Sequence, residues 1–229
     1  NGQLGQSLQF ISKKYSGIQF YFYSSIALDI TNKDTIEEVF TLINPNFCIN
    51  AAAYTAVDKA ESEVEKAFQI NVTGAKNLAQ VCNQFTTTLI HVSTDFVFDG
   101  NKNTPYTEGD STNPKGVYGK TKREGEIEII NNLQHYFIVR TSWLYSSFGN
   151  NFMKTMLKLA KDRDNLSVVN DQIGTPTHAV DLAQAIVKIV LSGSKNYGIY
   201  HFSNEGNTSW YGFAKEIFEL NNISINLQP

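Results

Sequence analysis

The sequence carries little charge and little cysteine for its length. Of its 229 residues, 18% are charged, and 22 acidic residues slightly outnumber 19 basic ones, which gives a net charge of −3. Disordered tails are poor in apolar residues, and nucleic-acid-binding domains have a large basic excess. Since 41% of the residues here are hydrophobic, we exclude both classes, expect one sizeable core and expect no nucleic-acid partner.

The sequence also lacks the patterns of a disulfide framework, a metal centre or a membrane span. The two cysteines, Cys48 and Cys82, lie in apolar segments and form no CxxC pair, and the four histidines have no metal-ligand spacing. The longest apolar runs, such as residues 185–191, fall far short of the roughly 18 residues that span a bilayer. We therefore expect a reduced, cytoplasmic protein with no bound metal.

Segments with helical apolar spacing alternate with short strand-like runs, which is typical of parallel βαβ units. The expected strands are residues 18–23, 47–50, 88–93, 137–141, 166–169 and 198–202. The expected helices are residues 4–11, 32–43, 63–83, 118–132, 151–162 and 178–191, and a last helix that begins at Ser209 with Thr208 as its cap. We therefore expect an α/β fold with a Rossmann-like, doubly wound parallel sheet, and a long loop over residues 99–115.

A glycine pair, Gly2 and Gly5, opens the first expected helix. Glycine lets the backbone N–H groups at the positive end of a helix approach a pyrophosphate, because no Cβ intervenes. Two glycines alone more often mark an ordinary turn. Here the βαβ pattern that follows places the turn at the sheet edge where doubly wound folds bind dinucleotides.

Tyr118 and Lys122 lie four residues apart at the start of a helix, which puts both side chains on one face. A phenol has a pKa of about 10 and exchanges protons poorly at neutral pH unless a nearby cation favours the phenolate. Most such pairs are ordinary surface residues, but the upstream strand ends in Ser93, Thr94 and Asp95 at the same sheet edge. A hydroxyl there can bind a substrate carbonyl while Tyr118 delivers a proton, and Lys122 is expected to lower the pKa of Tyr118.

Taken together, these motifs resemble the extended short-chain dehydrogenase/reductases and, within them, the dTDP-4-dehydrorhamnose reductases. The matching segments are residues 1–5, 28–31, 50–61, 93–100, 117–122, 140–143, 149–152 and 171–177, and they follow the family order along nearly the whole chain. The family also has a strand before the glycine turn and a further C-terminal segment, so we expect both to be missing here.

The resemblance implies an NAD(P)H-dependent enzyme. The expected reaction reduces the 4-keto group of dTDP-4-dehydro-6-deoxy-L-mannose to dTDP-L-rhamnose, for rhamnose-containing polysaccharides. The expected cofactor is NADPH or NADH, the expected partner is a dTDP-sugar substrate, and a homodimer is compatible with the family. Residues 1–145 are expected to be mainly the cofactor-binding domain, and residues 146–229 mainly a substrate-binding lobe, with strands and helices returning to the Rossmann core.

The resemblance also assigns roles to individual residues. Thr94 is expected to orient the carbonyl, Tyr118 to be the general acid, and Lys122 to support it and bind the cofactor ribose. The expected cofactor contacts are Gly2, Gln3, Leu4, Asp29, Ile30, Ala51, Ala52, Ala53, Ser93, Tyr118 and Lys122. The expected substrate contacts are Thr55, Val57, Phe96 and Trp143. Phe96 stands where the family has tyrosine, which puts one hydroxyl contact in question.

Other interpretations remain open at this point. A non-catalytic regulatory subunit, like that of methionine adenosyltransferase, shares the pattern but carries serine at the position of Thr94. Another sugar-nucleotide reductase or an epimerase also fits, whereas a dehydratase would have a carboxylate at Phe96. From the residues alone, Asp29 could be a helix-cap neighbour and Trp143 a core residue. Arg140 could meet a phosphate or a core carboxylate.

Overall fold

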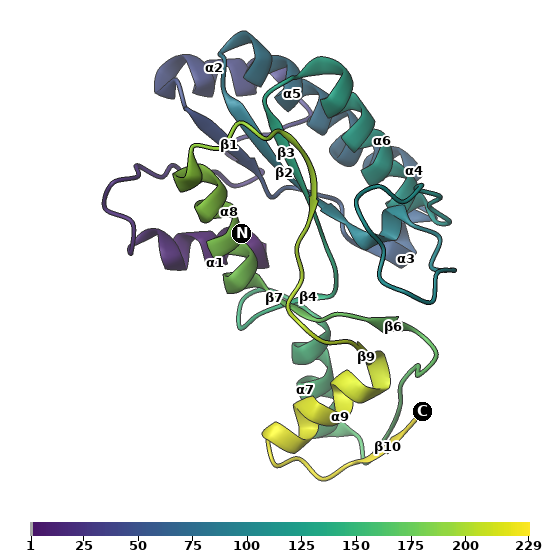
Figure 1. The fold of residues 1–229 in the computed structure, drawn as a ribbon. Helices are drawn as coiled ribbons and strands as arrows, with labels where there is room; N and C mark the ends of the chain where they lie inside the picture. Colours follow the sequence, from purple (N-terminus) through teal and green to yellow (C-terminus); the bar gives the residue numbers. More distant parts are fainter. Residues whose placement is uncertain (1) are drawn as a thin grey trace. The chain divides into compact units, whose positions relative to one another are not determined.

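The computed structural model describes residues 2–229, which form two compact units (Figure 1). The sheet unit contains residues 21–141 and 186–201, and the lobe unit contains residues 2–20, 142–185 and 202–229. The chain therefore passes between the units several times, and the expected division at residue 145 stays a prediction about what each part binds. Within the described residues, no helix is long and apolar enough to cross a membrane.

The sheet unit is built on four parallel strands in the order β1-β2-β3-β8. Their bounds are β1 Phe47–Asn50, β2 Thr88–Thr94, β3 Tyr136–Thr141 and β8 Gly198–His201. Successive parallel strands joined by helical crossovers are the expected α/β arrangement. The register places Asn50 opposite His91 and Ser93 opposite Arg140. The α/β expectation is confirmed.

Helices α2, α5 and α6 pack together beside the sheet (Figure 1). The helical segments of this unit are α2 Lys33–Ile43, α3 Val57–Ala60, α4 Val64–Phe68, the π-helix η1 Gln69–Thr73, α5 Gly74–Gln84, the 3-10 turn η2 Asp95–Val97, α6 Val117–Asn132 and the end of α8 Ala179–Ser192. Asn32 caps α2 by accepting from the Asp34 N–H. The long helix expected over residues 63–83 is real, but η1 interrupts it between α4 and α5.

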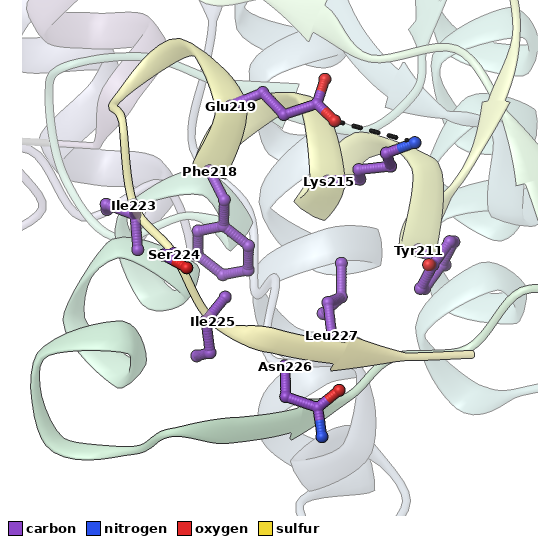
Figure 2. Close-up of a pocket in the computed structure, with 9 residues that line it drawn as sticks. All are labelled: Tyr211, Lys215, Phe218, Glu219, Ile223, Ser224, Ile225, Asn226 and Leu227. Carbon is purple, nitrogen blue, oxygen red and sulfur yellow. Dashed lines mark ion pairs between the residues drawn. The ribbon is translucent and has the colours of Figure 1, made fainter.

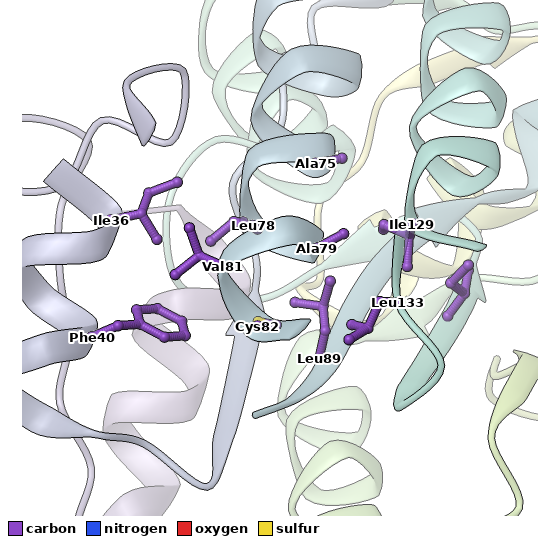
Figure 3. Close-up of a cluster of buried hydrophobic side chains, with 11 residues drawn as sticks. Ile36, Phe40, Ala75, Leu78, Ala79, Val81, Cys82, Leu89, Ile129 and Leu133 are labelled. Atoms are coloured by element: carbon purple, nitrogen blue, oxygen red, sulfur yellow. The ribbon is translucent and has the colours of Figure 1, made fainter. Parts of the chain in front are cut away.

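The core of the sheet unit lies between these helices and β2 (Figure 3). Its buried side chains come from α2, α5, α6, β2 and β3, and they include Ile36, Phe40, Leu78, Val81, Cys82, Leu89, Ile129 and Ile138. The helical members recur every three or four residues, which is the stripe that a helix buries against a sheet. The apolar periodicity of the sequence therefore predicted this core.

The expected strand over residues 18–23 is wrong, because no strand forms in that segment. Tyr21, Phe22 and Tyr23 are 50%, 40% and 41% exposed, respectively. Aromatic residues favour extended backbone, but a strand exists only where a neighbour pairs with its N–H and C=O groups. The sheet that the described chain forms does not include this segment. The other strands differ from expectation only at their ends.

The lobe unit contains helices α1, α7 and α9, the first half of α8 and three short strand pairs. The elements are α1 Gln3–Ser12, β4 Leu144–Tyr145, α7 Phe152–Asp162, β5 Asn165–Ser167, β6 Ile173–Gly174, β7 Thr177–His178, β9 Thr208–Ser209, α9 Trp210–Leu220 and β10 Asn226–Gln228. Ser209, one residue after the expected Thr208, caps α9 by accepting from the Gly212 N–H. Met156 of α7 and Ile217 and Phe218 of α9 form the centre of its core.

An open pocket of about 380 Å³ lies between α9 and β10 in the lobe unit (Figure 2). Its walls are partly apolar, with Phe218, Ile225 and Leu227 pointing toward one another, and partly polar. The exposed pair of Lys215 and Glu219, 3.7 Å apart, lies at its rim. No residue of the expected active site lines this pocket.

The core assignment gives a matched pair of leucine variants. Leu89 is fully buried, whereas Leu42 of α2 is 83% exposed. We expect Leu89→Ala to lower the free energy of unfolding by about 2–5 kcal/mol because it removes buried methyl groups and leaves a cavity, and Leu42→Ala to have little effect. Urea denaturation followed by circular dichroism measures both. Equal effects of the two variants would contradict this core.

Candidate active site

Helix α6 brings Tyr118 and Lys122 to the end of β2, where Thr94 is the last strand residue. The helix begins at Val117, whose N–H donates to the Glu61 carboxylate at 2.8 Å. A Cβ on Gly119 would lie 2.2 Å from the Phe96 carbonyl oxygen. Glycine at this position therefore allows the first turn of α6 to lie directly against η2.

The hydroxyl of Tyr118 interacts with the Thr94 side chain, and its ring meets the Phe96 ring edge-to-face with centroids 5.5 Å apart. Thr94 donates its hydroxyl to Asp95 at 3.0 Å and accepts from the Phe96 N–H at 3.2 Å. Desolvation by burial raises the pKa of Tyr118 to about 12 and that of Asp95 to about 6. Tyr118 therefore carries its proton at neutral pH and can act as a proton donor.

Lys122 is buried and turns its ammonium group toward β2. Its Nζ donates to the Val92 carbonyl at 2.8 Å and lies 3.1 Å from Nε2 of His91. Burial lowers the pKa of Lys122 to about 8, against the opposing field of Glu126. In this structure desolvation by burial is the largest influence on the pKa of Tyr118. The expected lowering of that pKa by Lys122 stays a prediction.

One turn beyond Lys122, the buried carboxylate of Glu126 joins α6 to two strands. It accepts from the Ser93 hydroxyl at 2.6 Å, from Arg140 at 2.9 and 2.7 Å, and from Arg123 at 3.0 Å. Arg140 therefore meets a core carboxylate, which decides between the two partners left open by the sequence. Its guanidinium also lies 5.2 Å from the centre of the Phe98 ring.

The remaining predicted residues of the sheet unit follow β1 or precede α2. Ala51 and Ala52 are exposed in the extended segment after β1, and Ala53 is half-buried. Thr55 is exposed, and Val57 opens α3. An exposed extended backbone of small residues at the carboxyl end of a parallel strand leaves room for a dinucleotide. Their predicted contacts with cofactor and substrate stay predictions.

Asp29 and Ile30 lie in the turn before α2. The Asp29 carboxylate accepts from the N–H and the hydroxyl of Thr31, at 2.9 and 2.8 Å. Ile30 packs against the core, and a Cβ on Gly74 would lie 2.6 Å from its side chain. The local hydrogen bonds of Asp29 match the helix-cap interpretation, and the adenine contact stays a prediction. Ser93 likewise has its hydroxyl bound to Glu126.

The predicted residues Gly2, Gln3, Leu4 and Trp143 belong to the lobe unit. A Cβ added at Gly2 or Gly5, at the start of α1, would have no atom within 4 Å. The N-cap residue of α1 is Gly2, which has no side chain to cap the helix. The N-terminus of α1 is thus open and electropositive, which fits a pyrophosphate. The Gln3 side chain binds within its own unit, donating to the Leu144 carbonyl at 3.0 Å. Leu4 is buried.

Trp143 is half-buried and has a left-handed backbone, with φ of 44°. Its indole stacks on that of Trp210 with centroids 3.5 Å apart and an angle of 11° between the rings. A Cβ on Gly174 would lie 2.4 Å from the Trp143 ring. The indole is thus held by a partner, Trp210, that the sequence did not single out.

The sequence interpretation missed three residues, His91, Glu126 and Trp210. A signal existed for Glu126, which follows Tyr118 and Lys122 at the same spacing of four. For His91, the alternation of strand side chains places it on the same face of β2 as Ser93. Among residues 2–229, no group of three or more His, Cys, Asp or Glu side chains is arranged to hold a metal ion.

The Glu126 network gives a stability prediction. Glu126→Gln removes the charge that neutralises the buried Arg140, and we expect it to lower the free energy of unfolding by about 3–5 kcal/mol. Glu219→Gln is the control, because the Lys215–Glu219 pair is exposed and contributes little. Chemical denaturation measures both. If both variants unfold at the wild-type denaturant concentration, Glu126 does not stabilise the fold as described.

Comparison with known proteins identifies the family. The family model described as RmlD substrate binding domain matches residues 1–229. The dTDP-4-dehydrorhamnose reductase of Aggregatibacter actinomycetemcomitans is 46% identical over 222 residues, which are 95% of this chain and 76% of that protein. The enzyme of Escherichia coli K12 is 44% identical over 194 residues, which are 83% of this chain and 65% of that protein. The chain thus spans about two thirds to three quarters of these relatives.

Solved structures agree with this result. A dTDP-4-dehydrorhamnose reductase from Clostridium acetobutylicum matches with a TM-score of 0.95 and 45% identity, covering 100% of this chain and 80% of that one. The Bacillus anthracis enzyme, solved in complex with NADP, matches with a TM-score of 0.94 and 43% identity over the same shares. A UDP-glucose 4-epimerase, at 20% identity and a TM-score of 0.81, shares the Rossmann-like fold. This chain belongs to the dTDP-4-dehydrorhamnose reductase family.

Proposed function

We propose that this chain is an NAD(P)H-dependent reductase that converts the 4-keto group of dTDP-4-dehydro-6-deoxy-L-mannose to the alcohol of dTDP-L-rhamnose, for rhamnose-containing polysaccharides. The observation that carries the proposal is the placement of a protonated Tyr118 against Thr94, with the buried Lys122 one turn away. The names of the relatives support the substrate, and the NADP complex of the Bacillus anthracis relative supports the cofactor.

The proposed chemistry needs a hydride for C4 and a proton for O4 of the sugar. The bound nicotinamide cofactor supplies the hydride. Tyr118 carries its hydroxyl proton at neutral pH and donates it to the oxygen as negative charge develops there. Thr94 turns its hydroxyl from Asp95 to the same oxygen and stabilises the charge.

Each unit, taken by itself, has groups that fit one part of the cofactor. The open N-terminus of α1 at Gly2 offers backbone N–H groups to the pyrophosphate. The exposed backbone of Ala51 and Ala52 would follow the dinucleotide. Lys122 would bind the ribose hydroxyls, and its ammonium would also favour the tyrosinate that remains after proton transfer.

We expect Tyr118→Phe to lower kcat by about two to four orders of magnitude, because the reaction loses its proton donor. Cofactor affinity should remain near wild type, since the ring and its packing against Phe96 are kept. The matched control is Tyr21→Phe, because Tyr21 is 50% exposed and lies outside the site. NADPH oxidation with the 4-keto sugar nucleotide measures kcat, and NADPH fluorescence measures binding.

Near-normal turnover in Tyr118→Phe would show that the proton donor is assigned wrongly. If wild-type protein binds NADPH and the nucleotide sugar but turns over neither, it is a binding module and not a reductase. The same assay with NADH in place of NADPH gives the cofactor preference.

We expect Trp143→Ala to lose most of kcat/KM with a small shift in melting temperature, because a half-buried indole contributes little to the core. Trp143 and Trp210 are the only two tryptophans of the chain, so fluorescence reports on this stack. Nucleotide product should quench the wild-type fluorescence strongly and that of Trp143→Ala weakly. Trp210→Phe is the control, since it keeps an aromatic face against Trp143 and leaves Trp143 as the single tryptophan.

A large drop in melting temperature with an unchanged kcat/KM would instead assign Trp143 to the core. Quenching of equal size in wild type and Trp143→Ala would place the nucleotide sugar away from this indole.

A further inference from the structure

Behind the proposed catalytic group, a chain of buried polar side chains runs from β1 through β2 to α6. Asn50, His91 and Lys122 are 4%, 1% and 2% exposed, respectively. Strand register places Asn50 and His91 opposite each other. Nδ2 of Asn50 lies 3.0 Å from Nδ1 of His91, and Nε2 of His91 lies 3.1 Å from Nζ of Lys122.

The orientation of the Asn50 amide determines which nitrogen of His91 carries the proton. Oδ1 of Asn50 accepts from the Ala52 N–H at 3.0 Å, so the NH₂ group of Asn50 faces His91. A donor at this distance requires a lone pair on Nδ1. Burial holds the pKa of His91 well below its ordinary value, so the ring is neutral. Its single proton is therefore on Nε2.

The Nε2–H of His91 points at the amino group of Lys122. An ammonium group has only donors, so it would face His91 donor to donor. An uncharged amine has a lone pair that accepts from Nε2–H, and it can still donate to the Val92 carbonyl at 2.8 Å. Every polar atom of this buried chain is satisfied only when Lys122 is uncharged.

We propose that Asn50 and His91 are positioning residues for Lys122: Asn50 fixes the His91 tautomer that donates from Nε2, and this tautomer favours the uncharged amine of Lys122. The two residues thereby set the pH at which Lys122 gains and loses its charge. Desolvation by burial acts on Lys122 in the same direction.

Other charged groups surround this chain on the elements packed against α6. On α6 itself, Glu126 favours the ammonium form of Lys122, but its carboxylate is already paired with Arg123 and Arg140. Asp95 of η2 raises the pKa of Tyr118 through charge repulsion. On the α3 and α4 side, Glu61 binds the N-terminus of α6 and Glu63 binds the Tyr54 hydroxyl. The direct partners of the Lys122 amino group remain His91 and Val92.

The consequence for turnover rests on the proposed function. The ammonium of Lys122 favours the tyrosinate that forms on proton transfer, so kcat/KM should fall as rising pH removes this charge. Because the His91 tautomer favours the uncharged amine, it moves that fall to lower pH. A variant in which this tautomer is less favoured should shift the alkaline limb of the kcat/KM profile to higher pH.

The decisive experiment uses ¹⁵N NMR of the full chain without added cofactor, so it needs no turnover. In wild type, we expect His91 to show the Nε2–H tautomer without titrating from about pH 5 to about pH 9, and Lys122 to titrate below the ordinary lysine pKa. The Lys122 signal is assigned by its loss in Lys122→Arg. The same samples give the pH profile of kcat/KM.

Two variants replace the Nε2–H donor that faces Lys122 with an acceptor, each in a different way. His91→Gln offers an amide oxygen to the ammonium group. Asn50→Asp keeps the acceptor for the Ala52 N–H and makes Nδ1 of His91 a donor, so its Nε2 lone pair faces Lys122. We expect both to raise the Lys122 titration midpoint by about one pH unit or more and to shift the alkaline limb alike. His135→Gln, outside this chain of contacts, should change neither.

An Nδ1–H tautomer of His91 in wild type overturns the proposal, and so does an unchanged Lys122 midpoint in either variant that folds. If one variant unfolds, the other variant and the wild-type tautomer still decide. If the wild type shows no reductase activity while the NMR results are as expected, the proposed function fails and the role of Asn50 and His91 stands.

Discussion

The buried carboxylate of Glu126 is the contact on which the arrangement of the site depends. A charge without solvent must be paired, and Glu126 is paired with a hydroxyl from β2 and a guanidinium from β3. These bonds fix where α6 lies on the sheet. Since Tyr118 and Lys122 belong to the first turns of the same helix, their placement beside Thr94 follows from this one ionic group.

The buried face of α6 is therefore shared between stability and chemistry. Its buried residues include Thr121, Lys122, Glu126 and Ile129, so the face that would ordinarily be apolar carries two ionisable side chains. The Glu126 carboxylate stabilises the fold through its arginines, whereas the Lys122 amino group has only a carbonyl and a histidine as partners. A group held with fewer partners than its charge demands is one that can change its protonation state.

Periodicity predicted those parts of the molecule whose packing is local. The helices α2, α5 and α6 and the strands β2 and β3 were found because their apolar residues repeat every three to four or every two positions. The strand over residues 18–23 was wrong because pairing is not local. The spacing of four between Tyr118 and Lys122 was readable, but the contact of His91 with Asn50 depends on the register between two strands. Neither strand segment alone determines that register.

Two glycines of α6 limit how this helix can move or evolve. A Cβ on Gly119 or on Gly125 would lie 2.2 Å from a backbone carbonyl oxygen, that of Phe96 or that of Asn71 in η1. These two close main-chain contacts, at separate points along α6, hold the helix against η2 and η1. The entropy of aligning the reacting side chains is thus lost once, during folding, and not again at each encounter with a ligand. New substrate specificities in this fold are expected to arise from changes in the loops around α6, while the packing of α6 on the sheet stays unchanged.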